Sequence, residues 1–155
     1  MNNQDFTLSF VLDQTPREVF NAINNVTAWW TENLTGGSQK QGDEFSVCFG
    51  DIHYSKQKLT TVEPDAKVVW LITDSKLTFV KTQDEWTGTE CIFDISKEGN
   101  KTLLRFTHHG LVPQFECFNG CSTGWTYYIN SLVSLITTGE GKRDKKVTEP
   151  QAETI

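Results

Sequence analysis

Residues Gly120 to Gly139 read GCSTGWTYYINSLVSLITTG and predict one long helix near the end of the chain. Its apolar side chains recur at intervals of three and four, which places them on one side of a helix: Trp125, Tyr128, Ile129, Leu132, Leu135 and Ile136. Gly139 and Gly141 follow as stop signals. A single long helix that follows a run of strands must bury its apolar side on the sheet. We therefore expect a cavity between this helix and a curved sheet.

Most of the chain before this helix has the alternation and the β-branched or aromatic content typical of strands. The predicted strands, the fifth of them the weakest, are Phe6–Leu12, Glu44–Phe49, Ile52–Glu63, Lys67–Thr73, Leu77–Lys81, Thr87–Lys97 and Lys101–His109. Gly50-Asp51 and Gly99-Asn100 suit tight hairpin turns. Short antiparallel strands joined by hairpins exclude a doubly wound α/β fold.

Two short helices are predicted after the first strand. Thr15 and Glu18 form a Thr-x-x-Glu capping box, and Pro16 fits the first helical position of a helix that continues to Ile23. The segment Val26 to Leu34 indicates a second short helix. The expected fold class is thus α+β, with an antiparallel curved sheet of about six or seven strands gripping a long C-terminal helix.

Length and charge limit the classes of function. A chain of 155 residues has the size of one domain, and we expect a single domain over residues 1–139 and a flexible charged tail over 140–155. A net charge of −6 argues against nucleic acid as a partner. The basic residues Lys142, Arg143, Lys145 and Lys146 lie in the tail. They leave open a contact with lipid or nucleic acid, besides the simpler interpretation of a solvated tail.

Targeting signals and cysteines give little information about the function. We expect no membrane insertion, since no apolar run approaches the roughly 20 residues that span a bilayer. The start MNNQDFTLSF lacks the features of a signal peptide, which predicts a cytoplasmic location. Cys48 and Cys91 fall in strand patterns and are expected to be buried. Cys117 and Cys121 are expected in the loop before the last helix, either as a zinc site with His108 and His109, as a reactive pair or as ordinary thiols. We expect no metal and no cofactor.

Several motifs, in this order and spacing, resemble a known family. They are TPREVFNAI at residues 15–23, Trp29-Trp30, Val62-Glu63-Pro64 before Val68-Val69-Trp70, Gly88-Thr89-Glu90-Cys91, and Thr102–Gly110 ahead of Gly124-Trp125. The chain is similar to the START-like, helix-grip (SRPBCC) superfamily, and within it to the group related to the activator of the heat-shock-protein-90 ATPase. The resemblance covers nearly all of residues 5 to 139. It implies a seven-stranded type of antiparallel sheet around the last helix, often with a pocket for a small apolar or amphipathic ligand.

The candidate site follows from strand alternation and from an unusual number of aromatic residues. Cys91 and Phe93 should face the helix because Glu90 and Asp94 lie on the opposite face. The predicted cavity-lining residues are Trp29, Trp30, Phe45, Trp70, Phe79, Trp86, Cys91, Phe93, Phe106, His108, Trp125 and Tyr128. His108 projects inward, either as a core histidine bonded to a backbone carbonyl or as a donor that orients a ligand. His53, at the start of a long strand, is expected to be exposed or at an edge.

Motifs for catalysis are sparse. The chain has no phosphate-binding glycine loop and no His-Glu-x-x-His pair. The leading interpretation is a non-catalytic domain, monomeric or homodimeric, that binds a small hydrophobic or amphipathic molecule. Two alternatives remain open. One is a cochaperone-like module with a chaperone partner, implied only by the family; the other is a cyclase- or hydrolase-like enzyme centred on His108.

Overall fold

The computed structural model describes residues 5–49, 53–78, 80–81, 83–112 and 118–141. Three helices and seven strands follow one another along this part of the chain. In order they are β1 (Phe6–Leu12), α1 (Pro16–Asn24), α2 (Val26–Trp29), β2 (Leu34–Gly36), β3 (Glu44–Phe49), β4 (His53–Glu63), β5 (Lys67–Leu77), β6 (Glu90–Glu98), β7 (Lys101–His109) and α3 (Phe118–Thr138).

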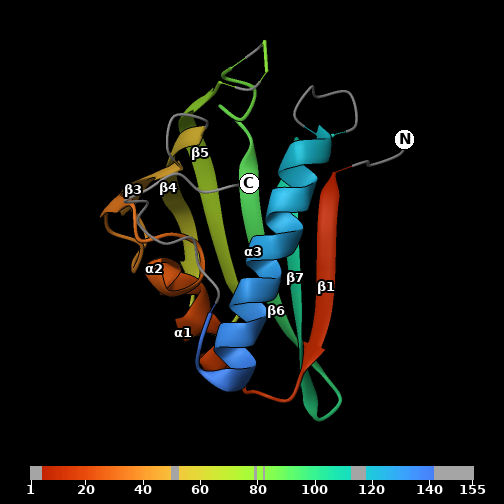
Figure 1. The fold of residues 1–155 in the computed structure, drawn as a ribbon. Coiled ribbons are helices and arrows are strands. Elements are labelled where there is room, and N and C mark those ends of the chain that lie inside the picture. The colour runs from red at the N-terminus through yellow and green to blue at the C-terminus, as the bar shows by residue number, and fades with distance from the viewer. Residues whose placement is uncertain (1–4, 50–52, 79, 82, 113–117, 142–155) are drawn as a thin grey trace.

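All seven strands belong to one antiparallel sheet with the order β1-β7-β6-β5-β4-β3-β2. Figure 1 shows α3 crossing one face of this curved sheet in front of β6 and β7, with α1 and α2 on the same face. The first strand pairs with the last, since Phe6 lies opposite His108 and Leu12 opposite Thr102. The predicted α+β fold, a curved sheet with a long C-terminal helix, is confirmed.

The predicted capping box starts α1. The Thr15 hydroxyl accepts a hydrogen bond from the backbone N–H of Glu18 at 3.1 Å, and the Glu18 carboxylate accepts one from the backbone N–H of Thr15 at 2.9 Å. Both bonds satisfy N–H groups that a helix start leaves unpaired. Val19 and Ile23 are fully buried, so α1 packs one side against the core.

The hairpin of β6 and β7 turns at Gly99-Asn100, as predicted, with Glu98 opposite Lys101. Gly99 has φ of +63°, a conformation that glycine adopts without the strain of a Cβ atom. Alternation along β6 also follows the prediction, because Cys91 and Phe93 are fully buried. On the opposite face Asp94 lies 3.5 Å from Lys67 of the neighbouring strand.

The long helix α3 ends at Thr138, and the N–H of Gly139 (φ +89°) bonds the carbonyl of Leu135 at 3.0 Å. The Ser131 hydroxyl of this helix donates to the backbone carbonyl of Trp29 at 2.8 Å, which ties α3 to α2. No helix in the described part of the chain is long and apolar enough to span a membrane.

Several predicted boundaries are wrong. The second helix ends at Trp29 and not at Leu34, because the chain there leaves the helix to form the edge strand β2, which pairs with β3. Leu77 is the last residue of β5, which pairing with β4 extends beyond Thr73, and the described residues Thr78, Val80 and Lys81 form no separate strand. The chain from Thr87 to Thr89 precedes β6 and forms no part of it.

One predicted feature differs in burial, and two others lie outside the described residues. Cys48 is exposed, because its side chain falls on the outer face of β3 between the inward-facing Val47 and Phe49. The turn predicted at Gly50-Asp51 and the tail from Lys142 to Ile155 lie outside the described residues.

The core is built largely from indole rings. Trp29 and Trp30 of the α2 segment both stack on Trp70 of β5, with ring centroids 6.2 and 5.6 Å apart. Phe93 of β6 meets Trp70 edge-on at 4.8 Å. Burying each such ring stabilises the fold by roughly 1.5–3 kcal/mol, so these rings explain how a sheet with few covering helices retains a core.

Candidate functional site

A chain of hydrogen bonds joins α3 to the sheet around His108. The Trp125 indole donates to His108 Nδ1 at 2.9 Å, and His108 Nε2 lies 2.8 Å from the Thr89 hydroxyl. The Thr89 hydroxyl in turn donates to the backbone carbonyl of Trp86 at 2.6 Å. Because an indole N–H can only donate, Nδ1 must be the acceptor and the imidazole proton lies on Nε2. Both ring nitrogens of His108, the Trp125 indole and the Thr89 hydroxyl therefore have hydrogen-bond partners.

His108 faces inward and is fully buried, as predicted. Its partners differ from the expected backbone carbonyl, since they are the Trp125 indole and the Thr89 hydroxyl. Burial lowers the pKa of His108 to about 3, so the ring is neutral at pH 7. With both nitrogens engaged, this histidine has no free atom to offer a ligand without breaking one of these bonds.

A cavity of about 30 Å³, partly enclosed, lies beside this chain, between α3 and the β3–β4 part of the sheet. The space exceeds the roughly 10–15 Å³ that one water molecule requires. The described residues around it include five aromatic side chains besides the histidine and carry no formal charge. They are Trp30, Phe49, His53, Trp86, Cys121, Gly124, Trp125 and Tyr128.

The structure places the predicted site residues in two groups. Trp30, Trp86, Trp125 and Tyr128 line the cavity. Seven others are buried in the core but do not line it: Trp29, Phe45, Trp70, Cys91, Phe93, Phe106 and His108. Phe79 lies outside the described residues. The two groups touch, because Phe106 contacts Trp125 with ring centroids 4.6 Å apart.

Four lining residues were not predicted: Phe49, His53, Cys121 and Gly124. The expectation that His53 is exposed or at an edge is wrong, because the side chain is buried and β4 is paired on both sides. The signal was present in the alternation along β4. Counting back in steps of two from the buried Leu59 places Gln57, Ser55 and His53 on the inner face.

These three polar side chains of β4 form a second buried hydrogen-bond chain. The Gln57 amide donates to the Ser55 hydroxyl at 2.5 Å, and His53 Nε2 lies 3.0 Å from the same hydroxyl. The ring of His53 meets those of Phe49 and Trp86 nearly at right angles, at 5.1 and 4.7 Å. Burial lowers the pKa of His53 to about 3, so this ring is neutral too.

Among the described residues, Cys121, His108 and His109 have partners other than a metal. Cys121 lies in the first turns of α3 and not in a loop, and its sulfur accepts a hydrogen bond from the Trp86 indole at 3.3 Å. Burial raises the pKa of Cys91, which keeps that thiol protonated. Cys117 lies outside the described residues, within which no group of three or more His, Cys, Asp or Glu side chains could hold a metal.

Comparison with known proteins identifies the family of this fold. Residues 13–137 match the family model described as "Activator of Hsp90 ATPase homolog 1-like protein". The chain belongs to this family. The resemblance to the START-like, helix-grip superfamily is confirmed by the same match. No protein with a curated description matches the chain.

Solved structures with this fold are distant in sequence. The solution structure of the Aha1 dimer from Colwellia psychrerythraea is 22% identical, with a TM-score of 0.72, 88% of this chain covered and 98% of that one. DynU16, a protein of the dynemicin biosynthetic locus, is 16% identical, with a TM-score of 0.65, 94% of this chain covered and 52% of that one. SSP2350 from Staphylococcus saprophyticus is 14% identical, with a TM-score of 0.66, 91% of this chain covered and 98% of that one. At these identities the likeness shows the fold alone.

The two buried histidines predict a loss of stability in acid. Each has a folded-state pKa of about 3, below the ordinary value of 6.5. Between these values the unfolded chain binds protons that the folded chain does not. The free energy of unfolding should therefore fall as the pH drops from about 6.5 towards 3.

Urea unfolding at several pH values between 7 and 4 measures this slope. In His53→Gln the slope should fall by about one proton relative to the wild type, whatever the absolute stability of the variant, while the carboxylates contribute equally in both proteins. An unchanged slope would show that His53 binds a proton in the folded state.

Proposed function

We propose that this chain is a non-catalytic binding domain for a small, uncharged hydrophobic molecule, which enters between the sheet and α3. The observation that carries this proposal is the cavity at that interface, whose lining among the described residues has five aromatic side chains besides His53 and no charged one. Ligand sites in proteins are mostly apolar with a few placed polar groups, and this lining has that composition. The same proposal holds that the protein is a single domain, is cytoplasmic, and is a monomer or a homodimer.

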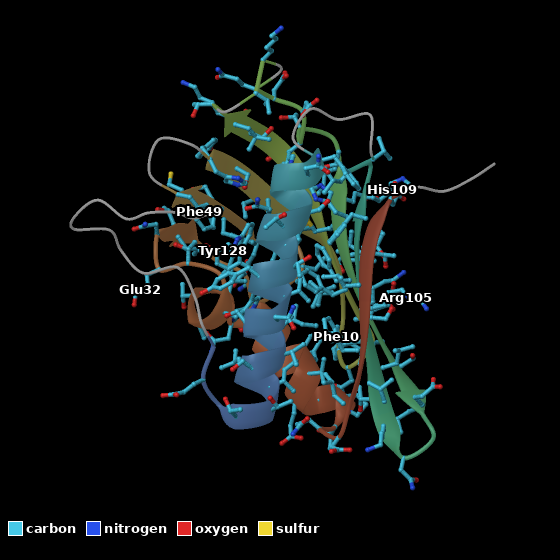
Figure 2. The ribbon with its side chains drawn as sticks, turned by 45° about the vertical axis from the view of Figure 1, so that its right-hand side comes forward. Phe10, Glu32, Phe49, Arg105, His109 and Tyr128 are labelled. Carbon is cyan, nitrogen blue, oxygen red and sulfur yellow. The ribbon has the colours of Figure 1, made fainter. Side chains whose placement is uncertain are left out.

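The cavity is too small for a ring-sized ligand unless side chains move. A benzene-sized guest occupies a cavity of about 150 Å³, several times the 30 Å³ present. The proposal therefore requires lining side chains to move. Phe49 and Tyr128 are suited to this, because their rings lie 5.5 Å apart at the rim and keep 8% and 6% exposure. Figure 2 shows both side chains together on the β3 side of α3.

The geometry supports binding over the cyclase- or hydrolase-like alternative. A general base needs a free nitrogen within reach of substrate and a pKa near the working pH. His108 meets neither requirement, since both its nitrogens are bonded and its pKa is about 3. The thiol of Cys91 is buried and stays protonated, which leaves it a poor nucleophile.

Gly124 provides a sharp test of the binding proposal. This residue is buried in α3 and lines the cavity, so Gly124→Ala adds a methyl group at the cavity wall. Alanine also has a higher intrinsic helix propensity than glycine, by about 1 kcal/mol. We expect the wild type to show a raised melting temperature with some member of a panel of single-ring and fused-ring hydrocarbons. The Gly124→Ala variant should lose that response.

Gly120→Ala is the matched control, because Gly120 lies in the same helix but is exposed and does not line the cavity. It should keep the ligand response of the wild type. Silence of the wild type across the whole panel, or an equal response in Gly124→Ala, would contradict binding at this site.

A cochaperone-like role is the second candidate, favoured by the family to which the chain belongs. In this proposal an outer surface of the domain binds a chaperone of the heat-shock-protein-90 class. Adding the purified chain to such a chaperone should then raise its rate of ATP hydrolysis in a saturable manner. Gly124→Ala should stimulate as well as the wild type, because Gly124 is buried. No change in rate over a wide range of chain concentrations would rule this role out.

A further inference from the structure

The cavity has hydrogen-bonding atoms that nothing in the described part of the chain satisfies. His53 is more than nine-tenths buried and lines the cavity. Its Nε2 atom is held by Ser55, and no described residue is hydrogen-bonded to its Nδ1 atom. A polar atom without a partner in a mostly apolar cavity is the kind of group that orients a ligand, so Nδ1 is a position where a bound molecule can contribute a bond.

The neighbours of His53 decide which nitrogen carries the proton. With the Gln57 amide placed so that its Nε2 faces Ser55, this nitrogen can only donate, and the Ser55 oxygen accepts from it at 2.5 Å. The Ser55 hydroxyl proton then has one acceptor within reach among the described residues, His53 Nε2 at 3.0 Å, since Gln57 Oε1 has no partner. Because the neutral ring carries one proton and Nε2 accepts, that proton lies on Nδ1.

A second donor lies at the same cavity. The indole of Trp30 lines it, and within the described chain its N–H has no hydrogen-bond partner. The other two lining indoles are engaged, Trp86 with the sulfur of Cys121 and Trp125 with His108. Among the described residues, the unpartnered polar groups of His53 and Trp30 at this site are therefore donors. A bound molecule would have to supply the acceptor.

We propose that the cavity selects uncharged, planar molecules that carry a carbonyl-type oxygen, and that the Nδ1–H of His53 donates a hydrogen bond to this oxygen. This inference rests on the proposed function and specifies the class of ligand. The rings of Phe49 and Trp86 lie nearly perpendicular to that of His53 and hold the imidazole in one orientation. The Ser55–Gln57 chain holds the imidazole from behind.

The same lining disfavours acids. No Lys or Arg lines the cavity, and both nearby histidines are neutral. A carboxylate that entered would lose its hydration and gain no opposite charge, which is far more costly than burying a ketone that receives a hydrogen bond.

Three probes of nearly the same shape test the inference on the wild-type protein. Acetophenone has the carbonyl oxygen, α-methylstyrene replaces this oxygen with a methylene group, and benzoate adds a charge. We expect acetophenone to bind about three- to tenfold more tightly than α-methylstyrene, the range for one net hydrogen bond. Benzoate should bind at least about tenfold more weakly than acetophenone. Isothermal titration calorimetry at pH 7 measures all three.

His53→Phe removes the donor and keeps an aromatic ring. The preference for acetophenone over α-methylstyrene should disappear in this variant, while α-methylstyrene still binds. His109→Phe is the control, because His109 is exposed at the end of β7 and does not line the cavity. It should keep the preference of the wild type.

A measurement on the wild type keeps the test valid if His53→Phe does not fold. The ¹⁵N resonance of His53 Nδ1 should move with acetophenone and much less with α-methylstyrene. Equal affinity of these two probes, or tighter binding of benzoate, overturns the inference but leaves hydrophobic binding intact. If none of the three binds and the hydrocarbon panel is also silent, the proposed function and this inference fail together.

Discussion

The hydrogen bond from the Trp125 indole to His108 Nδ1 is the contact on which the helix–sheet interface depends. It fixes α3 against β7, and the Thr89 hydroxyl extends the connection to the backbone of Trp86. Three elements distant in sequence thus meet at one imidazole. Each partner is buried, so the loss of any one leaves an unsatisfied polar atom whose cost is about 1–3 kcal/mol. The arrangement therefore positions α3 more specifically than apolar contact alone.

Aromatic packing follows from this position and limits the cavity. Trp125 stacks on Trp86 with ring centroids 5.7 Å apart and lies 5.1 Å from Trp30. Trp30 stacks on Trp70, so the rings run without interruption from the helix to the middle of the sheet. Most of the space that a curved sheet and one helix would enclose is filled by these rings. The cavity that remains is small, its described lining is uncharged, and two unpartnered donors, on His53 and Trp30, lie at it. These three properties define the ligand that we propose.

Local periodicity explains which features could be predicted from the sequence. The apolar side of α3, the inward Phe93 and His108, and the turn at Gly99 all follow from patterns within one element. The edge strand β2 could not be predicted, because three residues form it only by pairing with β3. The inward direction of His53 also follows from the alternation along β4. Its full burial could not be predicted, because it depends on β3 and β5 lying on both sides of β4 and on rings contributed by distant segments.

¹⁵N NMR of the histidine rings measures whether His108 is a neutral, fully bonded connection between helix and sheet. At pH 7 and again at pH 5, we expect a neutral His108 with its proton on Nε2 and an accepting Nδ1 coupled to the Trp125 indole. A His108 ring that carries its proton on Nδ1, or that becomes charged between these pH values, would contradict it.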